Sequence, residues 1–197
     1  GPSVMITSSR FWEDLASKIR VRMSDAGWIK RKLYEWSVDV GKRMVEAQAA
    51  KKDPPPMLRL AHKIANRLVF RPLLDRVGCA CFRAAYTGGH PISPDVILFF
   101  RSIGLNLKQC YGLTEACGIF QVQPDGEVKL ETVGKPLPET TVRIAEDQEI
   151  LVKSDANFVG YHQDYQATES AFADGWLKTG DAGYIDPEGH LLIIGRK

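Results

Sequence analysis

Three loop clusters in the sequence combine residue types that bind nucleotides and phosphates. The first is Thr87-Gly88-Gly89, where paired glycines let the backbone approach a flat ligand or a phosphate closely. A tight turn accounts for this pair equally well, and the pair matches neither the G-x-x-x-x-G-K-[ST] nor the G-x-G-x-x-G pattern. The glycine pair therefore carries meaning only together with the other two clusters.

The second cluster is Tyr111-Gly112-Leu113-Thr114-Glu115, which places an aromatic ring, a hydroxyl and a carboxylate in one short loop. A ring can stack on a base, a hydroxyl can bond a phosphate, and a carboxylate can hold Mg²⁺. We expect this loop at the carboxyl end of a strand, where α/β sheets bind their ligands.

The third cluster runs from Trp176 to Asp181, and Gly195-Arg196-Lys197 ends the sequence. A carboxylate such as that of Asp181 can accept both hydroxyls of a ribose, and a guanidinium such as that of Arg196 can bond the same sugar or a phosphate. Either segment alone is typical of a surface turn.

Helices are predicted for the first third of the chain, because apolar residues recur there every three or four positions. Ser8 or Ser9 is a suitable N-cap for the first helix, and Gly27 separates it from the second. Asp53-Pro54-Pro55-Pro56 ends the second helix, because proline lacks the backbone donor. A third helix is predicted from Met57 to Phe70.

The residue pattern changes at Val77, and the residues that follow predict a strand, a helix and a second strand. The small apolar run from Val77 to Ala85 is typical of a buried strand. Ser93-Pro94 reads as an N-cap followed by proline at the first helical position, and Gly104 closes that helix. Leu105 to Tyr111 is the second predicted strand, and this order favours a parallel sheet.

From Ile119 onward, short apolar stretches alternate with turns, which predicts a small, mostly antiparallel β subdomain. The fold class is therefore α/β: a helical lead-in, a partial parallel sheet with flanking helices, and the β subdomain. The predicted elements of the tail are four strands and one short helix, namely Thr141–Ile144, Glu149–Lys153, Ala182–Ile185, His190–Ile194 and the helix Thr168–Phe172.

The composition excludes a disordered chain, a collagen, a disulfide-stabilised miniprotein and an integral membrane protein. Hydrophobic residues make up 44% and charged residues 25% of the 197 residues, as in an ordinary globular protein. No apolar run approaches the roughly 20 residues of a spanning helix. The four cysteines follow no zinc-binding spacing, which favours a reduced, cytoplasmic setting.

The net charge of +2 conceals a basic front half and an acidic remainder. Residues 1–76 carry a net +8 and residues 77–197 a net −6. Basic helices can meet an anionic lipid surface, a nucleic acid or an anionic substrate, or can be solvated faces. We expect no nucleic-acid partner, and hypothesise that residues 10–76 make peripheral contact with an anionic membrane.

The clusters, taken in order, resemble one family. GG-x-P, YGLTE, VGKPLP, GW-x-x-TGD and GRK together are similar to the adenylate-forming superfamily, over residues 77–197. The helical lead-in, with Arg31–Trp36 and Leu68-Val69-Phe70, resembles long-chain fatty acyl-CoA synthetases. The resemblance implies three parts: a helical segment 1–76, the βαβ part 77–119 of the adenylate-forming subdomain, and a β-barrel-like subdomain 120–197 ending at a hinge.

The resemblance also implies residue roles. Thr114 would bond the α-phosphate and Glu115 would hold Mg²⁺, which makes these two the expected catalytic residues. Asp181 would bind the ribose hydroxyls with Arg196 beside it. Gly88 and Gly89 would pass close to the adenine and the α-phosphate, and the Tyr111 ring would stack on the adenine. The other expected nucleotide contacts are Gln109 and Cys110, which would frame the adenine, and Gly112.

The acyl group would lie near Gly112 and Leu113. Cys110 departs from the family pattern, since many fatty-acid members have glycine there. Its thiol either narrows the acyl channel or is a silent exchange of one small residue for another. A nucleophilic role for Cys110 or Cys117 is not expected, because no histidine is placed to activate them.

The reaction implied is ATP-dependent activation of a long-chain fatty acid to acyl-AMP, followed by transfer to coenzyme A. ATP, Mg²⁺ and coenzyme A are the expected cofactors. Two alternatives remain open: a fatty acyl-AMP ligase or other adenylating enzyme, and a non-catalytic nucleotide-binding module. The family's phosphate loop and mobile C-terminal domain have no counterpart in the sequence, and Gly1-Pro2-Ser3 reads as a tag remnant. We therefore expect an excised part of the large N-terminal domain that does not form acyl-AMP alone.

Overall fold

The computed structural model describes residues 2–197, so Gly1 of the expected tag remnant lies outside the described residues. The chain forms two compact units, residues 1–108 and residues 109–197. Each unit has its own helices, strands and core. The three-part division expected from the sequence stays a prediction.

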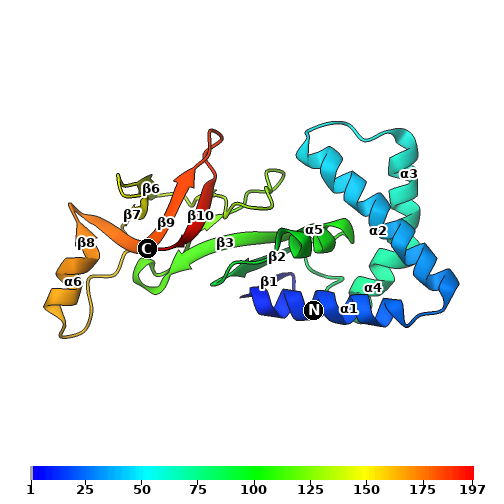
Figure 1. Ribbon diagram of the computed structural model, residues 1–197, viewed down its shortest axis with the longest axis horizontal. Helices are drawn as coiled ribbons and strands as arrows, with labels where there is room; N and C mark the ends of the chain where they lie inside the picture. The colour runs from blue at the N-terminus through cyan, green and yellow to red at the C-terminus, as the bar shows by residue number, and fades with distance from the viewer. Residues whose placement is uncertain (1) are drawn as a thin grey trace. The chain divides into compact units, whose positions relative to one another are not determined.

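Helices dominate the first unit (Figure 1). The predicted breaks are confirmed, because Gly27 precedes the second helix and the loop at 52–55 precedes the third. The predicted helix from Met57 to Phe70 is longer than expected and contains a π-helical turn. The helical segments are α1 (Ser9–Ser24), α2 (Trp28–Ala49), α3 (Pro56–Ala65), η1 (Asn66–Phe70), α4 (Arg71–Arg76) and α5 (Pro94–Ser102).

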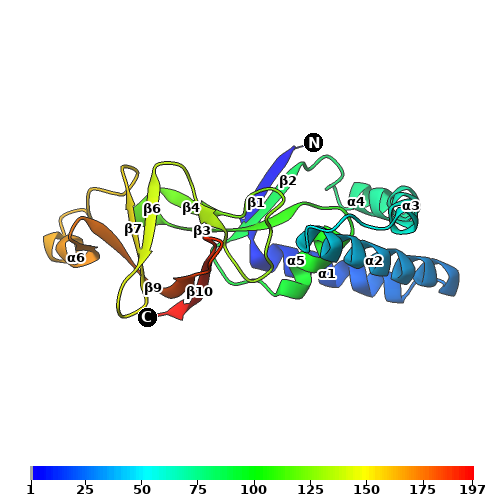
Figure 2. The same ribbon diagram turned by 90° about the horizontal axis from the view of Figure 1, so that it is seen from above.

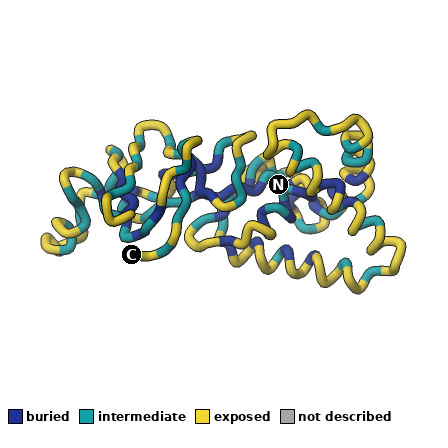
Figure 3. Tube along the Cα trace, turned by 45° about the horizontal axis from the view of Figure 1, so that its top comes forward, coloured by how far each residue is buried: buried dark blue, intermediate teal, exposed yellow. Residues whose placement is uncertain are grey.

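The core of this unit forms where α1 and α2 meet α5. Trp12 of α1 is fully buried, and its ring meets Phe100 of α5 edge-on at 5.2 Å between centroids. Gly41 of α2 approaches α5 so closely that an added Cβ would lie 2.0 Å from the Ser102 carbonyl oxygen. Buried positions recur every three or four residues along α1, whereas α3 has a single buried residue, Ala65. Figure 3 shows how buried and exposed positions are distributed along the chain.

Two parallel strands flank this helical core. β1 (Val4–Ser8) pairs with β2 (Ala84–Gly88) in the register Val4↔Ala84 to Ser8↔Gly88. No strand was predicted at residues 4–8. The pairing nevertheless confirms the expected parallel sheet, and β2 lies between β1 and β3 (Leu107–Leu113) in the strand order.

The predicted strand from Val77 to Ala85 was wrong over most of its length. Residues 77–79 instead terminate α4: Gly78 N donates to Asp75 O at 3.0 Å and Cys79 N to Leu74 O at 2.8 Å. Gly78 has φ +76°, the left-handed conformation that ends many helices. The apolar residues at the start of the run therefore form the end of α4, and the strand begins only at Ala84.

The strand–helix–strand order is confirmed. α5 begins after the N-cap Ser93 with Pro94 in its first turn, as the sequence predicts. β3 follows, and Ala85 N donates to Asn106 O at 3.0 Å just before it begins. β3 starts in the first unit and continues into the second, where it carries the cluster from Tyr111 to Leu113.

The second unit is mostly antiparallel, as predicted (Figure 2). β3 pairs with β4, and β4 with β5, while a second sheet has the order β10-β9-β7-β6 with β8 beside β9. The elements are β4 (Gly118–Val122), β5 (Lys135–Pro136), β6 (Thr140–Ile144), β7 (Glu149–Ser154), α6 (Tyr165–Ala171), β8 (Phe172–Ala173), β9 (Trp176–Ile185) and β10 (Leu191–Arg196).

Alternation along β9 decides which of its residues face the interior. Leu177, Thr179, Asp181 and Gly183 are buried, while the residues between them are partly accessible. This is the period of two that a half-buried strand requires. A carboxylate at Asp181 therefore faces inward among otherwise neutral positions, which needs partners to be tolerated.

Among residues 2–197, no helix combines the length and the apolarity that a transmembrane span requires.

Candidate functional site

Thr114 and Glu115 form a single 3₁₀ turn, Thr114–Ala116, directly after β3. The turn ends at Cys117, whose φ of 54° lies in the left-handed region. Thr114 is exposed and Glu115 is half-buried. Thr114 and Glu115 thus lie where β3 ends, as predicted, whereas the first three residues of the expected loop, 111–113, are the last residues of the strand.

Tyr111, Asp181 and Arg196 form a continuous polar chain. Tyr111 Oη donates to Asp181 Oδ2 at 2.5 Å, and Arg196 Nη1 lies 3.3 Å from Asp181 Oδ1. Arg196 and Asp181 are register partners on β10 and β9, so the sheet itself sets their proximity. The Asp181 side chain is largely buried at 12% exposure, whereas that of Arg196 is 75% exposed.

The contacts with Tyr111 and Arg196 explain why the buried carboxylate of Asp181 is tolerated on β9. Burial, and then the hydrogen bond to Asp181, raise the pKa of Tyr111 well above its ordinary value. The phenol therefore stays protonated and remains a donor to the carboxylate. The Tyr111 ring also packs edge-on against Phe120 at 4.9 Å, which fixes its orientation.

A cleft of about 480 Å³ opens within the second unit, and Arg196 is one of the residues that line it. Its polar lining includes the carboxylates of Glu115 and Glu149 and the cations of Lys178 and Arg196. Glu149 is already engaged, because it accepts Gly180 N at 3.0 Å and Lys197 Nζ at 2.9 Å. The cleft therefore combines the Glu115 carboxylate with two cationic side chains.

Tyr161 also lines the cleft and bonds Glu115. Its hydroxyl donates to Glu115 Oε1 at 2.7 Å, and Phe158 N donates to Glu115 O at 2.7 Å. The hydrogen bond to Glu115 raises the pKa of Tyr161, so the phenol is the donor at neutral pH. Sequence reasoning missed Tyr161, because it lies in none of the three clusters, and it gave Lys178 no role although that residue lies in the third.

Two expected adenine-framing residues, Gln109 and Cys110, do not line the cleft. The Gln109 amide donates to Leu130 O at 2.9 Å and to Thr132 O at 3.0 Å, both in the loop after β4. Cys110 is buried, and burial raises the pKa of its thiol to about 11. Any nucleotide contact at these positions would involve the backbone.

Gly112 has a structural requirement of its own. A Cβ there would lie 1.9 Å from the Gly118 carbonyl oxygen on the paired strand β4, at an irregularity in the register. Glycine is therefore needed for β3 and β4 to approach. The expected role beside the acyl group stays a prediction.

Gly88 and Gly89 belong to the first unit. Gly88 is the half-buried last residue of β2, and Gly89 is exposed with φ +84°. Glycine adopts the left-handed conformation of Gly89 without steric cost, which suits a chain that bends directly after β2. Their expected contacts with adenine and phosphate stay a prediction.

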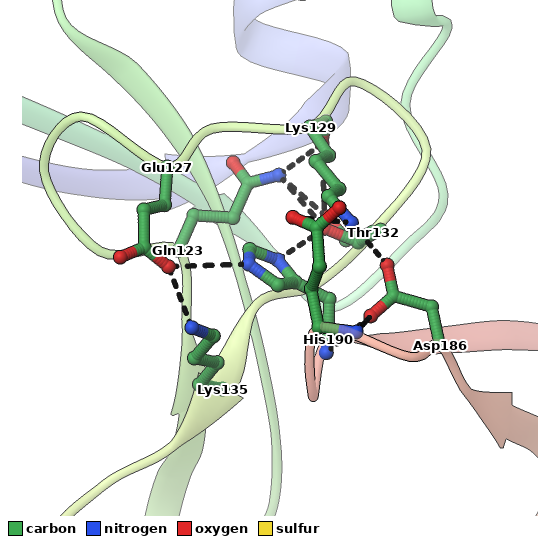
Figure 4. Close-up of polar contacts among 8 residues, drawn as sticks. Gln123, Glu127, Lys129, Thr132, Lys135, Asp186 and His190 are labelled. Atoms are coloured by element: carbon green, nitrogen blue, oxygen red, sulfur yellow. Dashed lines mark hydrogen bonds and ion pairs between the residues drawn. The ribbon is translucent and has the colours of Figure 1, made fainter. Parts of the chain in front are cut away.

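A second polar network in the same unit surrounds His190 (Figure 4). His190 is fully buried, with Nδ1 3.1 Å from Thr132 Oγ1 and Nε2 3.6 Å from Glu127 Oε2. Gln123 accepts Gln109 N at 2.7 Å and donates to Thr132 O at 2.7 Å. The network connects β3 to the loop after β4.

The residues of the cleft suit Mg²⁺ bound together with a phosphate. Within the described part of the chain, no three His, Cys, Asp or Glu side chains gather into a metal site made by protein alone. Mg²⁺ is usually held by one or two carboxylates plus substrate phosphates. Glu115, beside Lys178 and Arg196, fits that arrangement.

Comparisons with known proteins show which family the chain is similar to. The family described as AMP-binding enzyme matches residues 1–162. The chain is 37% identical over 196 residues to the long-chain-fatty-acid–CoA ligase FadD15 of Mycobacterium bovis, covering 100% of this chain and 32% of that protein. It is 28% identical to long chain acyl-CoA synthetase 3 of Arabidopsis thaliana, covering 100% of this chain and 30% of that protein. The chain thus spans about a third of the length of these curated relatives.

A solved structure of a coenzyme A synthetase is also similar to this chain. O-succinylbenzoate coenzyme A synthetase of Bacillus subtilis, in complex with ATP and magnesium ion, is 34% identical with a TM-score of 0.54. The match covers 59% of this chain and 27% of that one.

Proposed function

Because the chain belongs to the AMP-binding enzyme family, we propose a function for the protein that contains this chain and has the full length of its relatives. That protein activates a long-chain fatty acid with ATP. The fatty-acid carboxylate attacks the α-phosphate of ATP, forming acyl-AMP and releasing pyrophosphate. The thiol of coenzyme A then attacks the acyl carbon and displaces AMP. The similarity of the whole chain to FadD15 supports the long-chain substrate.

The observation that carries this proposal is the cleft lined by Glu115, Lys178 and Arg196. Mg²⁺ bound to Glu115 would neutralise charge on the phosphate oxygens. Lys178 and Arg196 would offer cationic hydrogen-bond donors to the same anionic substrate. Thr114 is exposed at the start of the turn that contains Glu115, and its hydroxyl would donate a hydrogen bond to the α-phosphate.

Asp181 would position the nucleotide sugar. Its carboxylate has two fixed donors, Tyr111 and Arg196, which hold it in one orientation. A carboxylate held in this way can still accept hydrogen bonds from ribose hydroxyls, because each oxygen has more than one lone pair. Fixed orientation contributes to rate by placing the α-phosphate before the reaction begins.

A direct test measures ATP–pyrophosphate exchange by the protein at the length of its relatives. Exchange that depends on a long-chain fatty acid, with acyl-CoA formed on addition of coenzyme A, is the expected result. Exchange without acyl-CoA would favour a carrier-dependent acyl-AMP ligase. Absence of exchange with every carboxylate would leave a nucleotide-binding module.

We also propose that the exposed face of α3 and η1 is the membrane-contacting part of residues 10–76. Met57, Leu60, Ile64 and Leu68 are 83%, 60%, 43% and 57% exposed and follow helical spacing. Beside them runs an exposed basic row, which consists of Arg59, Lys63 and Arg67. An apolar row beside a basic row is the pattern of helices that lie on anionic bilayers.

Sedimentation with vesicles tests this contact. The protein should sediment with phosphatidylserine-containing vesicles at low salt and much less with neutral ones, because basic residues near an anionic surface each add attraction. The double variant Lys63→Glu/Arg67→Glu should lose this preference, whereas Lys51→Glu/Lys52→Glu, with the same charge change in the loop after α2, should keep it. Equal binding to neutral and anionic vesicles would contradict the proposal.

A further inference from the structure

Glu115 is held by a residue that lies 46 positions further along the chain. Tyr161 Oη donates to Glu115 Oε1 at 2.7 Å, and both side chains line the same cleft. We propose that Tyr161 is a positioning residue for Glu115, which holds the carboxylate in the orientation that receives Mg²⁺ together with ATP. The inference rests on the proposed function, because it takes Glu115 as the metal-binding carboxylate.

The loop that carries Tyr161 is attached to Glu115 a second time through the backbone. Phe158 N donates to Glu115 O at 2.7 Å. The Phe158 ring meets the Tyr161 ring edge-on at 4.8 Å and stacks on Phe172 at 5.7 Å. Phe158 packs against the buried cluster of Phe120 and its neighbours, and the Tyr161 ring, 43% exposed, is linked to that cluster through Phe158.

The backbone on either side of Tyr161 is also fixed. Tyr161 N donates to Thr168 Oγ1 at 2.9 Å, and that hydroxyl donates to Asp164 O at 2.7 Å. Gly160 has φ +149°, and a Cβ there would lie 2.6 Å from the Thr168 methyl group. Glycine at 160 therefore permits the close approach between the loop and α6 that positions the phenol.

The geometry has a consequence for metal binding. A free glutamate side chain samples several rotamers, and fixing it on binding costs free energy. The phenol selects one rotamer in advance by occupying Oε1, and Oε2 has no described protein donor within hydrogen-bond distance. Partners that orient a metal ligand in this way commonly affect metal affinity by about 10-fold or more.

The test compares Tyr161→Phe with Tyr165→Phe in the protein at the length of its relatives. Tyr161→Phe keeps the ring and removes the donor. Tyr165 is 89% exposed and forms no side-chain hydrogen bond in the described part of the chain, so it is a matched control. The readout is the dissociation constant of Mn²⁺ in the presence of ATP, measured by electron paramagnetic resonance.

We expect Mn²⁺ binding to weaken about 10-fold in Tyr161→Phe and to stay unchanged in Tyr165→Phe. ATP affinity without metal and the melting temperature should match the wild type in both variants, which separates orientation of the carboxylate from a folding defect. Unchanged or tighter Mn²⁺ binding in Tyr161→Phe would overturn the inference, as would an equal loss in the control or no Mn²⁺ binding by the wild type.

Failure of the proposed function would look different. If the wild type shows no fatty-acid-dependent exchange, but Mn²⁺ binding still weakens in Tyr161→Phe, the reaction is wrong and the positioning role stands. If the wild type exchanges normally and Tyr161→Phe binds Mn²⁺ like the wild type, the positioning role alone is wrong.

Discussion

The hydroxyl of Tyr111 donates to Oδ2 of Asp181 at 2.5 Å, across 70 positions of sequence. Arg196 reaches the other oxygen of the same carboxylate at 3.3 Å. The YGLTE and TGD segments are therefore joined through their own side chains, and Asp181 is oriented before any nucleotide binds. This relationship makes the two segments one site.

Replacing Tyr111 with phenylalanine should weaken nucleotide binding. The ring and its packing on Phe120 remain, but Asp181 loses its neutral donor and becomes free to rotate toward Arg196. Asp181 would then be oriented only on binding, at a cost of roughly 0.5–1.5 kcal/mol for one side chain, so ATP should bind about 2- to 10-fold more weakly. Calorimetric titration with ATP measures this, and an unchanged affinity would show that the Tyr111–Asp181 bond has no part in the site.

Asp186 should make the stability of the second unit depend on acid. Its carboxylate accepts the backbone N–H groups of Glu188 and His190 at 2.9 Å each, and the Lys129 ammonium. These donors, Lys129 foremost, lower the pKa of Asp186 to about 2. Because the folded-state pKa lies below the unfolded one, the stabilisation is complete above about pH 4 and is lost as the pH falls toward about 2.

The variant Asp186→Asn tests this dependence. Urea denaturation should find the variant less stable than the wild type near neutral pH, and the gap should close between about pH 4 and about pH 2. Glu188→Gln is the control, because Glu188 is 65% exposed and pairs with Lys129 only at the surface. A gap that is constant over the whole pH range would contradict the assigned pKa.

Gly112→Ala should destabilise the fold whatever the role of this residue toward an acyl group. The new methyl group would meet the Gly118 carbonyl at 1.9 Å, so β3 and β4 would have to separate. Overpacking of this kind costs about 1–3 kcal/mol or more. Gly195→Ala on β10 is the control, since nothing lies within 4 Å of a Cβ there. Equal melting temperatures for the two variants would refute the steric reading.

The cysteines should divide into two reactivity classes. Cys81 and Cys117 are exposed, whereas Cys79 and Cys110 are buried. Burial raises the pKa of Cys110 to about 11, so very little of its thiol is ionised near neutral pH. Mass spectrometry after brief treatment with iodoacetamide should find the two exposed residues modified first. Modification of Cys110 as fast as that of Cys117 would contradict its burial.

Local patterns allowed much of the fold to be predicted. The N-cap near Ser8, the break at Gly27 and the Ser93-Pro94 start are set by residues within one turn of each helix. β1 was not predicted, because its five residues become a strand only through pairing with Ala84–Gly88 far along the chain. The run from Val77 was misassigned, because small apolar residues can end a helix as well as form a strand.

The same distinction applies to the site. Glu115, Asp181 and Arg196 were predicted because they belong to compact clusters of ligand-binding residue types. Tyr161 was missed because its importance comes from one contact with Glu115 across 46 residues. His190 was missed for a similar reason, since a fully buried histidine is recognisable only once its neighbours are known.

The most direct test of the central claim is ATP–pyrophosphate exchange by the protein at the length of its relatives, across fatty acids of increasing chain length, with Glu115→Gln in parallel. The account predicts exchange that peaks with long chains, acyl-CoA formation when coenzyme A is added, and a loss of about 100-fold or more in the variant, because removal of one group that stabilises developing charge typically costs that much. Exchange that is independent of any fatty acid, or that is undiminished in Glu115→Gln, would contradict it.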